Sequence, residues 1–322
     1  MRPRSWTGTA QAPVSMRVVE PRQPEPHGHH LITRWNYNPA LHGHRLCIEF
    51  KSAEVYRKHH VRWRTFANSL WRVVCKHSSL TFSDIPVDLG DGEVETIPAD
   101  VFRFARRPGQ PHDLLPNLHL LRPRPRLPQP IGWQEKTDSL YFRGAATGSR
   151  DYEQSIRIAA CRAARGIPET NCRLTRFPEV SDAFAERART EGLAGREDPL
   201  AEMNHHRFLL DVDGNTSSWD RFLLIGWFGG VPVRFEPAWE ECWHTSIRED
   251  VHFVTATRTT LPDVLNSLRA DPSRAQTIAA AASAVARQLL SSERVQRMLE
   301  ESWVTRIDRL PLVPLATLSE WP

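Results

Sequence analysis

The chain has 322 residues, of which 40% are apolar and 25% charged, and its formal net charge is +4. A length above the range in which one hydrophobic core keeps growing predicts two lobes, and the ordinary composition excludes wholesale disorder. The small net charge argues against nucleic acid as a partner.

The N-terminal 30 residues are interpreted as a loose lead-in, with Met16 as a second candidate start. They lack the apolar core of a signal peptide, and no run in the chain approaches the roughly 20 apolar residues of a membrane helix. The five cysteines form no CxxC pair, which fits a reducing compartment rather than a disulfide framework. We therefore expect a cytoplasmic protein, with at most peripheral contact with the cytoplasmic face of the inner membrane.

The first lobe is expected over residues 31–130. Alternating apolar residues predict a strand at 44–50, helical spacing predicts an amphipathic helix at 53–79, and β-prone residues predict strands at 80–82 and 99–107. Residues 122–130 contain four prolines and no periodic pattern, which favours a connection between lobes.

The second lobe is expected over residues 131–300, followed by a tail at 301–322 that packs back on the first lobe. Its strands and helices alternate, which predicts parallel βαβ units. The expected strands are at 139–144, 207–214, 231–235 and 252–256. The expected helices are at 149–166, 217–228 and 260–271, with one or two long helices over 273–307.

Asp211-Val212-Asp213 ends an apolar strand and precedes Gly214 and Asn215. Two carboxylates at this spacing supply hard oxygen ligands for a divalent cation that neutralises a diphosphate. The same residues also read as a strand end followed by a tight turn, because Gly and Asn tolerate left-handed backbone angles. The tripeptide alone leaves both interpretations open.

Thr216, Ser217 and Ser218 are candidate N-caps for a helix that begins near Trp219, whose free amide groups would attract an anion. Arg221 falls in the first turn of that helix, within reach of the same anion. The residues therefore predict a phosphate site or a plain turn between strand and helix.

A second small-residue turn follows the strand in "YFRGAATGSRD", at residues 141–151. Arg143, Thr147, Ser149 and Arg150 surround it. Because the carboxyl ends of parallel strands meet at one edge of a sheet, the two turns are expected to share a ligand crevice.

With both turns in view, the chain resembles glycosyltransferase family 90, the capsule-associated group that includes protein O-glucosyltransferases and fungal capsule xylosyltransferases. The likeness rests on "YFRGAATGSR", on "FLLDVDGNTSSWDRFLLIGWFGGVPVRF" followed by "AWEECW" and "VHFV", and on "AQTIAAAASAVARQLL". The first half matches through "LTFSDIPVD" and "VFRFARRPGQPHDLLPNLHLL". The chain looks like a bacterial member, because it lacks the signal sequence and paired cysteines of eukaryotic members.

The resemblance implies an α/β, GT-B-like fold with two Rossmann-like lobes, a cleft between them and long C-terminal helices. It implies inverting transfer from a UDP-sugar to a glycan or glycolipid of lipopolysaccharide or capsule type, with no cofactor and no metal ion. Asp84 in "TFSDIP" would be the general base. The nucleotide-sugar contacts would come from Arg143, Thr147, Ser149, Arg150, Asp213, Gly214, Asn215, Thr216, Ser217, Ser218 and Arg221. Where relatives often carry Ser after the "FRG" strand, this chain has Ala145.

Several alternatives stay open. Asp88 and Asp91 are fallback carboxylates for the base. A metal-dependent enzyme would use Asp211 and Asp213, and a non-catalytic polyanion-binding module would use the arginines, which outnumber lysines by 38 to 4. Basic residues of the first lobe favour an anionic acceptor; these are Arg57, Lys58, His60, Arg62 and Arg64.

Overall fold

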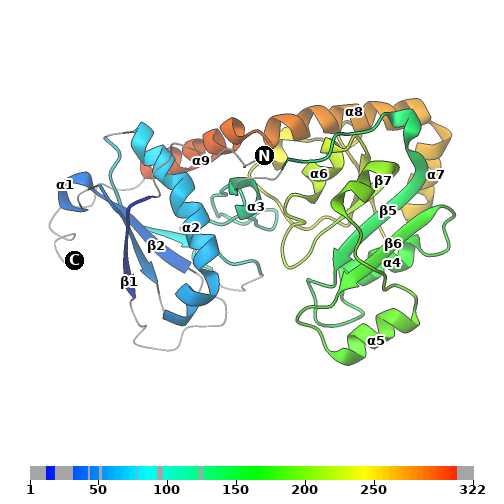
Figure 1. Ribbon diagram of the computed structural model, residues 1–322, viewed down its shortest axis with the longest axis horizontal. Helices are drawn as coiled ribbons and strands as arrows, with labels where there is room; N and C mark the ends of the chain where they lie inside the picture. Colours follow the sequence, from blue (N-terminus) through cyan, green and yellow to red (C-terminus); the bar gives the residue numbers. More distant parts are fainter. Residues whose placement is uncertain are drawn as a thin grey trace, which may run out of the picture.

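The computed structural model describes residues 12–18, 32–42, 44–50, 53–77, 79–92, 97–122 and 126–309. Two α/β lobes lie side by side, and helices α8 and α9 run along one side of both (Figure 1). The predicted α/β class and the long C-terminal helices are confirmed. None of the helices in these ranges is long and apolar enough to cross a membrane.

The first lobe is a four-stranded sheet with helices packed against it. Its strands are β1 (Val14–Val18), β2 (Ile32–Tyr37), β3 (Leu46–Phe50) and β4 (Phe82–Asp88), in the order β1-β3-β2-β4. Its helices are α1 (Pro39–His42), α2 (Ala53–Lys76) and α3 (Leu118–Leu121). The expected lead-in reaches into this sheet, because β1 pairs with β3, and the rest of residues 1–30 lies outside the described ranges apart from 12 and 13.

This sheet is mixed, whereas a Rossmann-like sheet is mostly parallel. The β1–β3 pair is parallel, but β2 is antiparallel to both β3 and β4. The physical reason is the connection between β2 and β3, which is shorter than the dozen or so residues that a parallel crossover needs. The expected strand at 99–107 is also wrong: Phe102, Arg103 and Arg106 each bridge to a different segment, so no ladder extends.

The second lobe has the predicted parallel sheet. Its strands are β5 (Thr137–Ala145), β6 (Thr170–Arg176), β7 (His206–Val212), β8 (Val231–Phe235) and β9 (Val254–Ala256), in the order β6-β5-β7-β8-β9. The α-helices are α4 (Ile156–Ala164), α5 (Asp182–Thr190), α6 (Arg221–Trp227), α7 (Leu261–Ala270) and α8 (Pro272–Leu289). Short 3-10 helices are η2 (Trp133–Glu135), η3 (Leu200–His205) and η4 (His244–Ser246).

Helix α9 (Ser292–Ile307) leaves the second lobe and packs on α2 of the first (Figure 1). Its Trp303 is fully buried and stacks on Phe102 with ring centroids 5.3 Å apart. The expected tail at 301–322 therefore begins inside a helix, and residues 310–322 lie outside the described ranges. The same hydrophobic core also contains Phe222 of α6 and Leu289 of α8, so it runs from one lobe into the other.

Candidate active site

A cavity of about 470 Å³, here called the central cavity, lies at the carboxyl ends of β5 and β7. This is where an open α/β sheet binds its ligands. The structure brings seven of the predicted site residues into its wall: Arg143, Thr147, Gly214, Asn215, Ser217, Ser218 and Arg221.

The two glycine turns touch each other, as the common sheet edge predicts. The Gly148 amide donates to Oδ1 of Asn215 at 2.8 Å. Gly148 has φ of +106°, and a Cβ there would lie 3.0 Å from the Gly214 carbonyl oxygen. A side chain would thus be strained and crowded at this position.

Arg157 holds the two turns together by hydrogen bonds to their backbone, and the sequence did not predict this role. Its guanidinium donates to the carbonyl oxygens of Ala145 at 2.8 Å, Asp213 at 2.9 Å and Val212 at 3.2 Å. Burial lowers the pKa of Arg157 to about 10, with Arg221 adding to the effect. The available signal was an arginine between apolar residues on the buried face of a predicted helix.

Arg221 lines the central cavity. Its guanidinium lies 4.8 Å from the centroid of the Phe142 ring, and within the described ranges it has no hydrogen-bond acceptor. Burial lowers its pKa, while Asp211 and Asp220 offset part of that effect. A half-buried cation with free donors attracts an anion, because the anion compensates for lost hydration.

The expected N-cap residues do not cap a helix. Helix α6 begins at Arg221 with Asp220 as its N-cap, and Trp219 before it has φ of +63°. The three hydroxyls instead donate to carboxylates: Thr216 to Asp91 at 2.7 Å, Ser217 to Glu241 at 2.5 Å, and Ser218 to Asp211. Because these bonds replace capping, the hydroxyls fix the shape of the turn.

Both carboxylates of the Asp-x-Asp motif have partners in the chain. Asp211 pairs with Arg234 at 3.3 Å, and Oδ2 of Asp213 accepts from the Ala238 amide at 2.8 Å. Burial raises the pKa of Asp213 to about 6. Across the described ranges, no cluster of three or more His, Cys, Asp or Glu side chains is placed to hold a metal ion.

Arg143 lies in the wall of the central cavity, but its guanidinium is occupied. It forms an ion pair with Asp198 at 2.8 Å and donates to the Asn171 carbonyl oxygen at 2.8 Å. Tyr141 donates to the same Asp198 at 3.1 Å. Arg143 therefore holds the loop around Asp198 against β5.

Ser149 and Arg150 line a second cavity, here called the adjoining cavity, of about 660 Å³. Asp213 also lies in its wall, and the first lobe contributes Arg107 and Asp91. Three residues line both this cavity and the central one: Asp91, Gly214 and Asn215.

Residues 127–301, more than half of the chain, match the protein family described as glycosyl transferase family 90. The chain belongs to this family. Among curated protein sequences none matches it. Solved structures similar to it include Anabaena HepE in complex with UDP-glucose (14% identity, 52% of this chain and 49% of that one, TM-score 0.38). Another is a glycosyltransferase from Rickettsia africae (8% identity, 55% of this chain and 50% of that one, TM-score 0.40). A third is the sucrose-phosphate synthase of Thermosynechococcus elongatus (16% identity, 53% of this chain and 46% of that one, TM-score 0.38). The chain spans about half the length of these structures.

Asp84, the base implied by the resemblance to family 90, lies on β4 with its side chain 64% exposed. It pairs with Arg34 at 2.8 Å and has φ of +56°. It lines neither the central cavity nor the adjoining cavity. Four residues of extended strand, about 13 Å, separate it from the end of β4 at Asp88.

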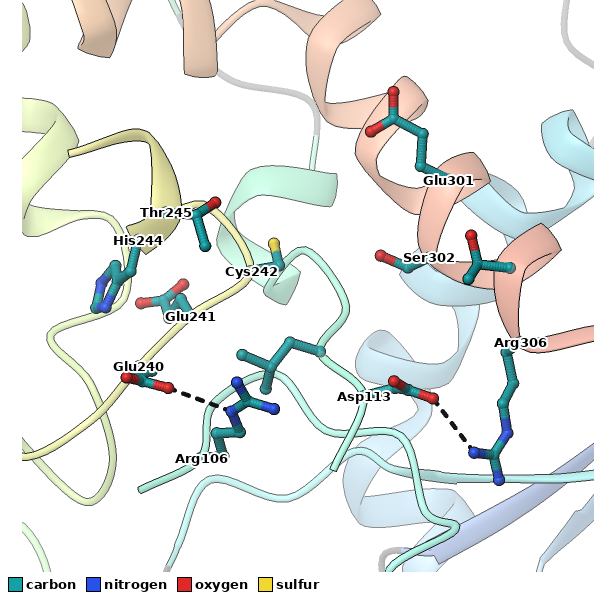
Figure 2. A pocket seen from close by; sticks show the side chains of 12 residues that line it. Arg106, Asp113, Glu240, Glu241, Cys242, His244, Thr245, Glu301, Ser302 and Arg306 are labelled. Atoms are coloured by element: carbon teal, nitrogen blue, oxygen red, sulfur yellow. Dashed lines mark hydrogen bonds and ion pairs between the residues drawn. The ribbon is translucent and has the colours of Figure 1, made fainter. Parts of the chain in front are cut away.

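The lobes of this family 90 chain are tied together around a third cavity of about 600 Å³, here called the junction cavity (Figure 2). Arg106 of the first lobe and Glu240 of the second exchange two backbone hydrogen bonds and form an ion pair at 3.2 Å. On the other side of the cavity in Figure 2, Arg306 of α9 pairs with Asp113 at 3.2 Å.

Glu241 is buried beside this junction and links it to the central cavity. Its carboxyl group accepts from Ser217 of the turn, from Asn117 at the start of α3, and from Trp243. Burial raises its pKa to about 8, because desolvation outweighs the three donors. The shape of the turn thus depends on a carboxyl group that is partly neutral near pH 8.

Proposed function

We propose that the chain transfers a sugar from a UDP-sugar to a hydroxyl of a glycan or glycolipid acceptor, with inversion and without a metal ion. Membership of family 90 supports sugar transfer. The UDP-sugar donor, the inversion and the acceptor class follow from the resemblance of the sequence to that family.

The observation that carries the donor site is Arg221, which lines the central cavity and whose guanidinium has no hydrogen-bond acceptor among the described residues. The joined turns at Gly148 and Asn215 lie in or beside the same cavity. Positive charge held in advance beside a leaving diphosphate offsets the negative charge that develops on it.

The test is UDP binding, measured by calorimetry and by thermal unfolding. UDP at 100 times its Kd adds about 2.7 kcal/mol to the stability of the folded chain, which corresponds to roughly 5–10 °C in Tm. Arg221→Ala removes a charged donor worth about 1.5–3 kcal/mol, so its Kd for UDP should rise about 10- to 150-fold.

Arg189→Ala is the matched control, because Arg189 lies on α5, pairs with Glu186 and lines none of the three cavities. Equal UDP affinity of wild type and Arg221→Ala, or no binding of UDP to the wild type, would contradict the proposed donor site. A panel of UDP-glucose, UDP-galactose, UDP-xylose and UDP-glucuronic acid then identifies the sugar.

Metal independence is proposed because the chain itself engages Asp211 and Asp213. A cation at Asp211 would lie beside the Arg234 guanidinium that already neutralises this carboxylate, and like charges repel. Loss of UDP-sugar turnover in EDTA, with recovery on adding Mn²⁺, would establish the metal-dependent alternative instead. Inversion is checked by NMR, since a UDP-α-sugar should yield a β-linked product.

A further inference from the structure

Glu241 lies between the junction cavity and the turn that follows β7. It is only 2% exposed and belongs to the wall of the cavity in Figure 2. Its Oε1 contacts the Ser217 hydroxyl at 2.5 Å, and its Oε2 contacts the side chains of Asn117 and Trp243. Ser217 also lines the central cavity. One buried carboxyl group thus contacts a residue of the proposed donor site directly.

Of these three partners, one can change from donor to acceptor. The Trp243 indole has an N–H and no acceptor. The Asn117 amide is fixed, because its Oδ1 accepts from the Leu120 amide at 3.1 Å and its Nδ2 is left to contact Glu241. The Ser217 hydroxyl can either donate or accept. When Glu241 is neutral, its proton must therefore lie on Oε1 and be donated to Ser217.

The charge of Glu241 thereby sets the direction of the Ser217 hydroxyl. Beside an ionised carboxylate, Ser217 donates its hydrogen to Oε1. Beside a neutral carboxyl group, Oγ of Ser217 accepts from Oε1 and from the Trp219 amide at 3.3 Å, so its own hydrogen remains for a ligand in the central cavity. A phosphate oxygen accepts hydrogen bonds, so it binds better to the second arrangement.

Burial favours the neutral form of Glu241 at pH 7. Desolvation raises the pKa of Glu241 to about 8, and the charge of Asp220 adds to this increase, while the three hydrogen-bond donors oppose it. Asp220 is itself paired with His119 at 3.4 Å. The ionisable groups next to Glu241 in the chain, Cys242 and His244, stay uncharged between pH 7 and pH 9. Burial raises the pKa of the Cys242 thiol and lowers the pKa of the His244 imidazole well below its usual value.

The other charged groups of the junction cavity form ion pairs: Glu240 with Arg106, Asp113 with Arg306, and Glu301 with Arg294. Burial also lowers the pKa of Lys136 to about 8. Lys136 directly precedes β5, whereas the central cavity lies at the other end of that strand. Substitutions of Glu241 and Lys136 therefore separate two groups that titrate in the same range of pH.

We propose that neutral Glu241 is a positioning residue of the donor site, because it turns the Ser217 hydroxyl into a donor for the diphosphate of the UDP-sugar. This inference rests on the proposed function. UDP binding and protonation of Glu241 are then linked: the diphosphate favours the neutral carboxyl group, and loss of its proton weakens binding. The charge of the diphosphate acts in the same direction, since it repels an ionised carboxylate nearby.

The experiment measures the Kd for UDP by calorimetry at pH 7, 8 and 9. The wild-type Kd should rise about tenfold from pH 7 to pH 9, as the neutral fraction of Glu241 falls. At pH 8 each bound UDP should take up about half a proton, measured in two buffers with different enthalpies of ionisation. Glu241→Gln keeps a donor for Ser217 at every pH, so its Kd should match that of wild type at pH 7 and stay constant to pH 9.

Ser217→Ala removes the hydroxyl itself. Its Kd should be about 10- to 150-fold higher than that of wild type at pH 7, and it should lose most of the pH dependence and of the proton uptake. Glu240→Gln and Lys136→Met are the matched controls, and both should follow the pH dependence of wild type. Any titration of UDP itself is common to all these proteins.

A wild-type Kd that stays constant between pH 7 and pH 9 would overturn the inference, as would a Glu241→Gln variant that keeps the wild-type pH dependence. Equal losses of UDP affinity at pH 7 in Glu241→Gln and Ser217→Ala would also overturn it, because they would show a structural role alone. Should Glu241→Gln fail to fold, proton uptake in wild type and its loss in Ser217→Ala decide the question. Failure of the wild type to bind UDP at pH 7 would instead refute the proposed function.

Discussion

Replacing Glu241 by Gln should make the protein more stable at alkaline pH. The pKa of Glu241 is raised by burial to about 8 in the folded chain, against 4.5 for an ordinary glutamate. A carboxyl group whose pKa rises on folding favours the folded state below pH 4.5, and this contribution disappears as the pH rises through 8. The wild type should therefore lose up to about 5 kcal/mol of unfolding free energy across this window through this single group.

Glutamine fits the same three contacts without a charge. Its Oε1 accepts from Asn117 and Trp243, and its Nε2 donates to the Ser217 hydroxyl, which the carboxyl group contacts at 2.5 Å. The Glu241→Gln variant should consequently retain the turn and avoid the cost of ionising a buried group. Its advantage in Tm over wild type should grow from near zero at pH 5 to roughly 10 °C at pH 8.

Thermal unfolding from pH 5 to pH 8 in steps of half a unit measures this difference. Glu240→Gln is the matched control, because Glu240 is the preceding residue, is 38% exposed and pairs with Arg106. Because Glu240 stays partly hydrated, folding removes little of the water around its carboxylate. The Glu240→Gln variant should therefore show no growing advantage in Tm over wild type between pH 5 and pH 8. Parallel curves of Tm against pH for wild type and Glu241→Gln would show that the three donors keep Glu241 ionised.

Three further changes test the packing around the site. Gly148→Ala should lower Tm and weaken UDP binding. The drop in Tm should be larger than that of Gly109→Ala, because both glycines have positive φ but only Gly148 has a neighbour within 4 Å of the added Cβ. Trp303→Ala should reduce the unfolding free energy measured in urea by about 3–5 kcal/mol, since it empties a fully buried site. Arg157→Met should lower the free energy of unfolding by about 3 kcal/mol or more and reduce UDP affinity, because three carbonyl oxygens lose their donor. UDP affinity equal to that of wild type in a folded variant would contradict this role of Arg157.

The sequence predicted the elements with strong local signals. Apolar runs identified β7 and β8, and helical spacing identified α2 and α8. Strand β6 (Thr170–Arg176) was not predicted because only Cys172 and Leu174 of its seven residues are buried, which leaves a short alternation between polar residues. The segment at 99–107 has β-prone residues, but its backbone partners come from three distant segments, and no local pattern reveals that.

The site residues likewise divide into those that local patterns predicted and those that depend on tertiary contacts. Small residues after parallel strands predicted both turns, because any ligand crevice of such a sheet lies at that edge. The helix start at Arg221 could not be read locally, since three hydroxyl groups prefer carboxylates that arrive from elsewhere in the chain. Asp91 and Glu241 are 125 and 24 residues from the hydroxyls that they bind. Their importance depends on tertiary contacts.

Continuity of the core limits how far the lobes can move apart in the proposed reaction. Separation of the lobes would divide a hydrophobic cluster that has members in both, and it would break the Arg106–Glu240 bridge. Burial of such side chains contributes roughly 1.5–3 kcal/mol each, so wide opening costs more free energy than UDP binding supplies at ordinary concentrations. For the proposed donor site, the two turns and Arg221 would then be held in place before the substrate arrives, which is the condition under which fixed charges lower a barrier without reorganisation. Specificity in this chain should accordingly reside in the walls of the two cavities rather than in closure of one lobe on the other.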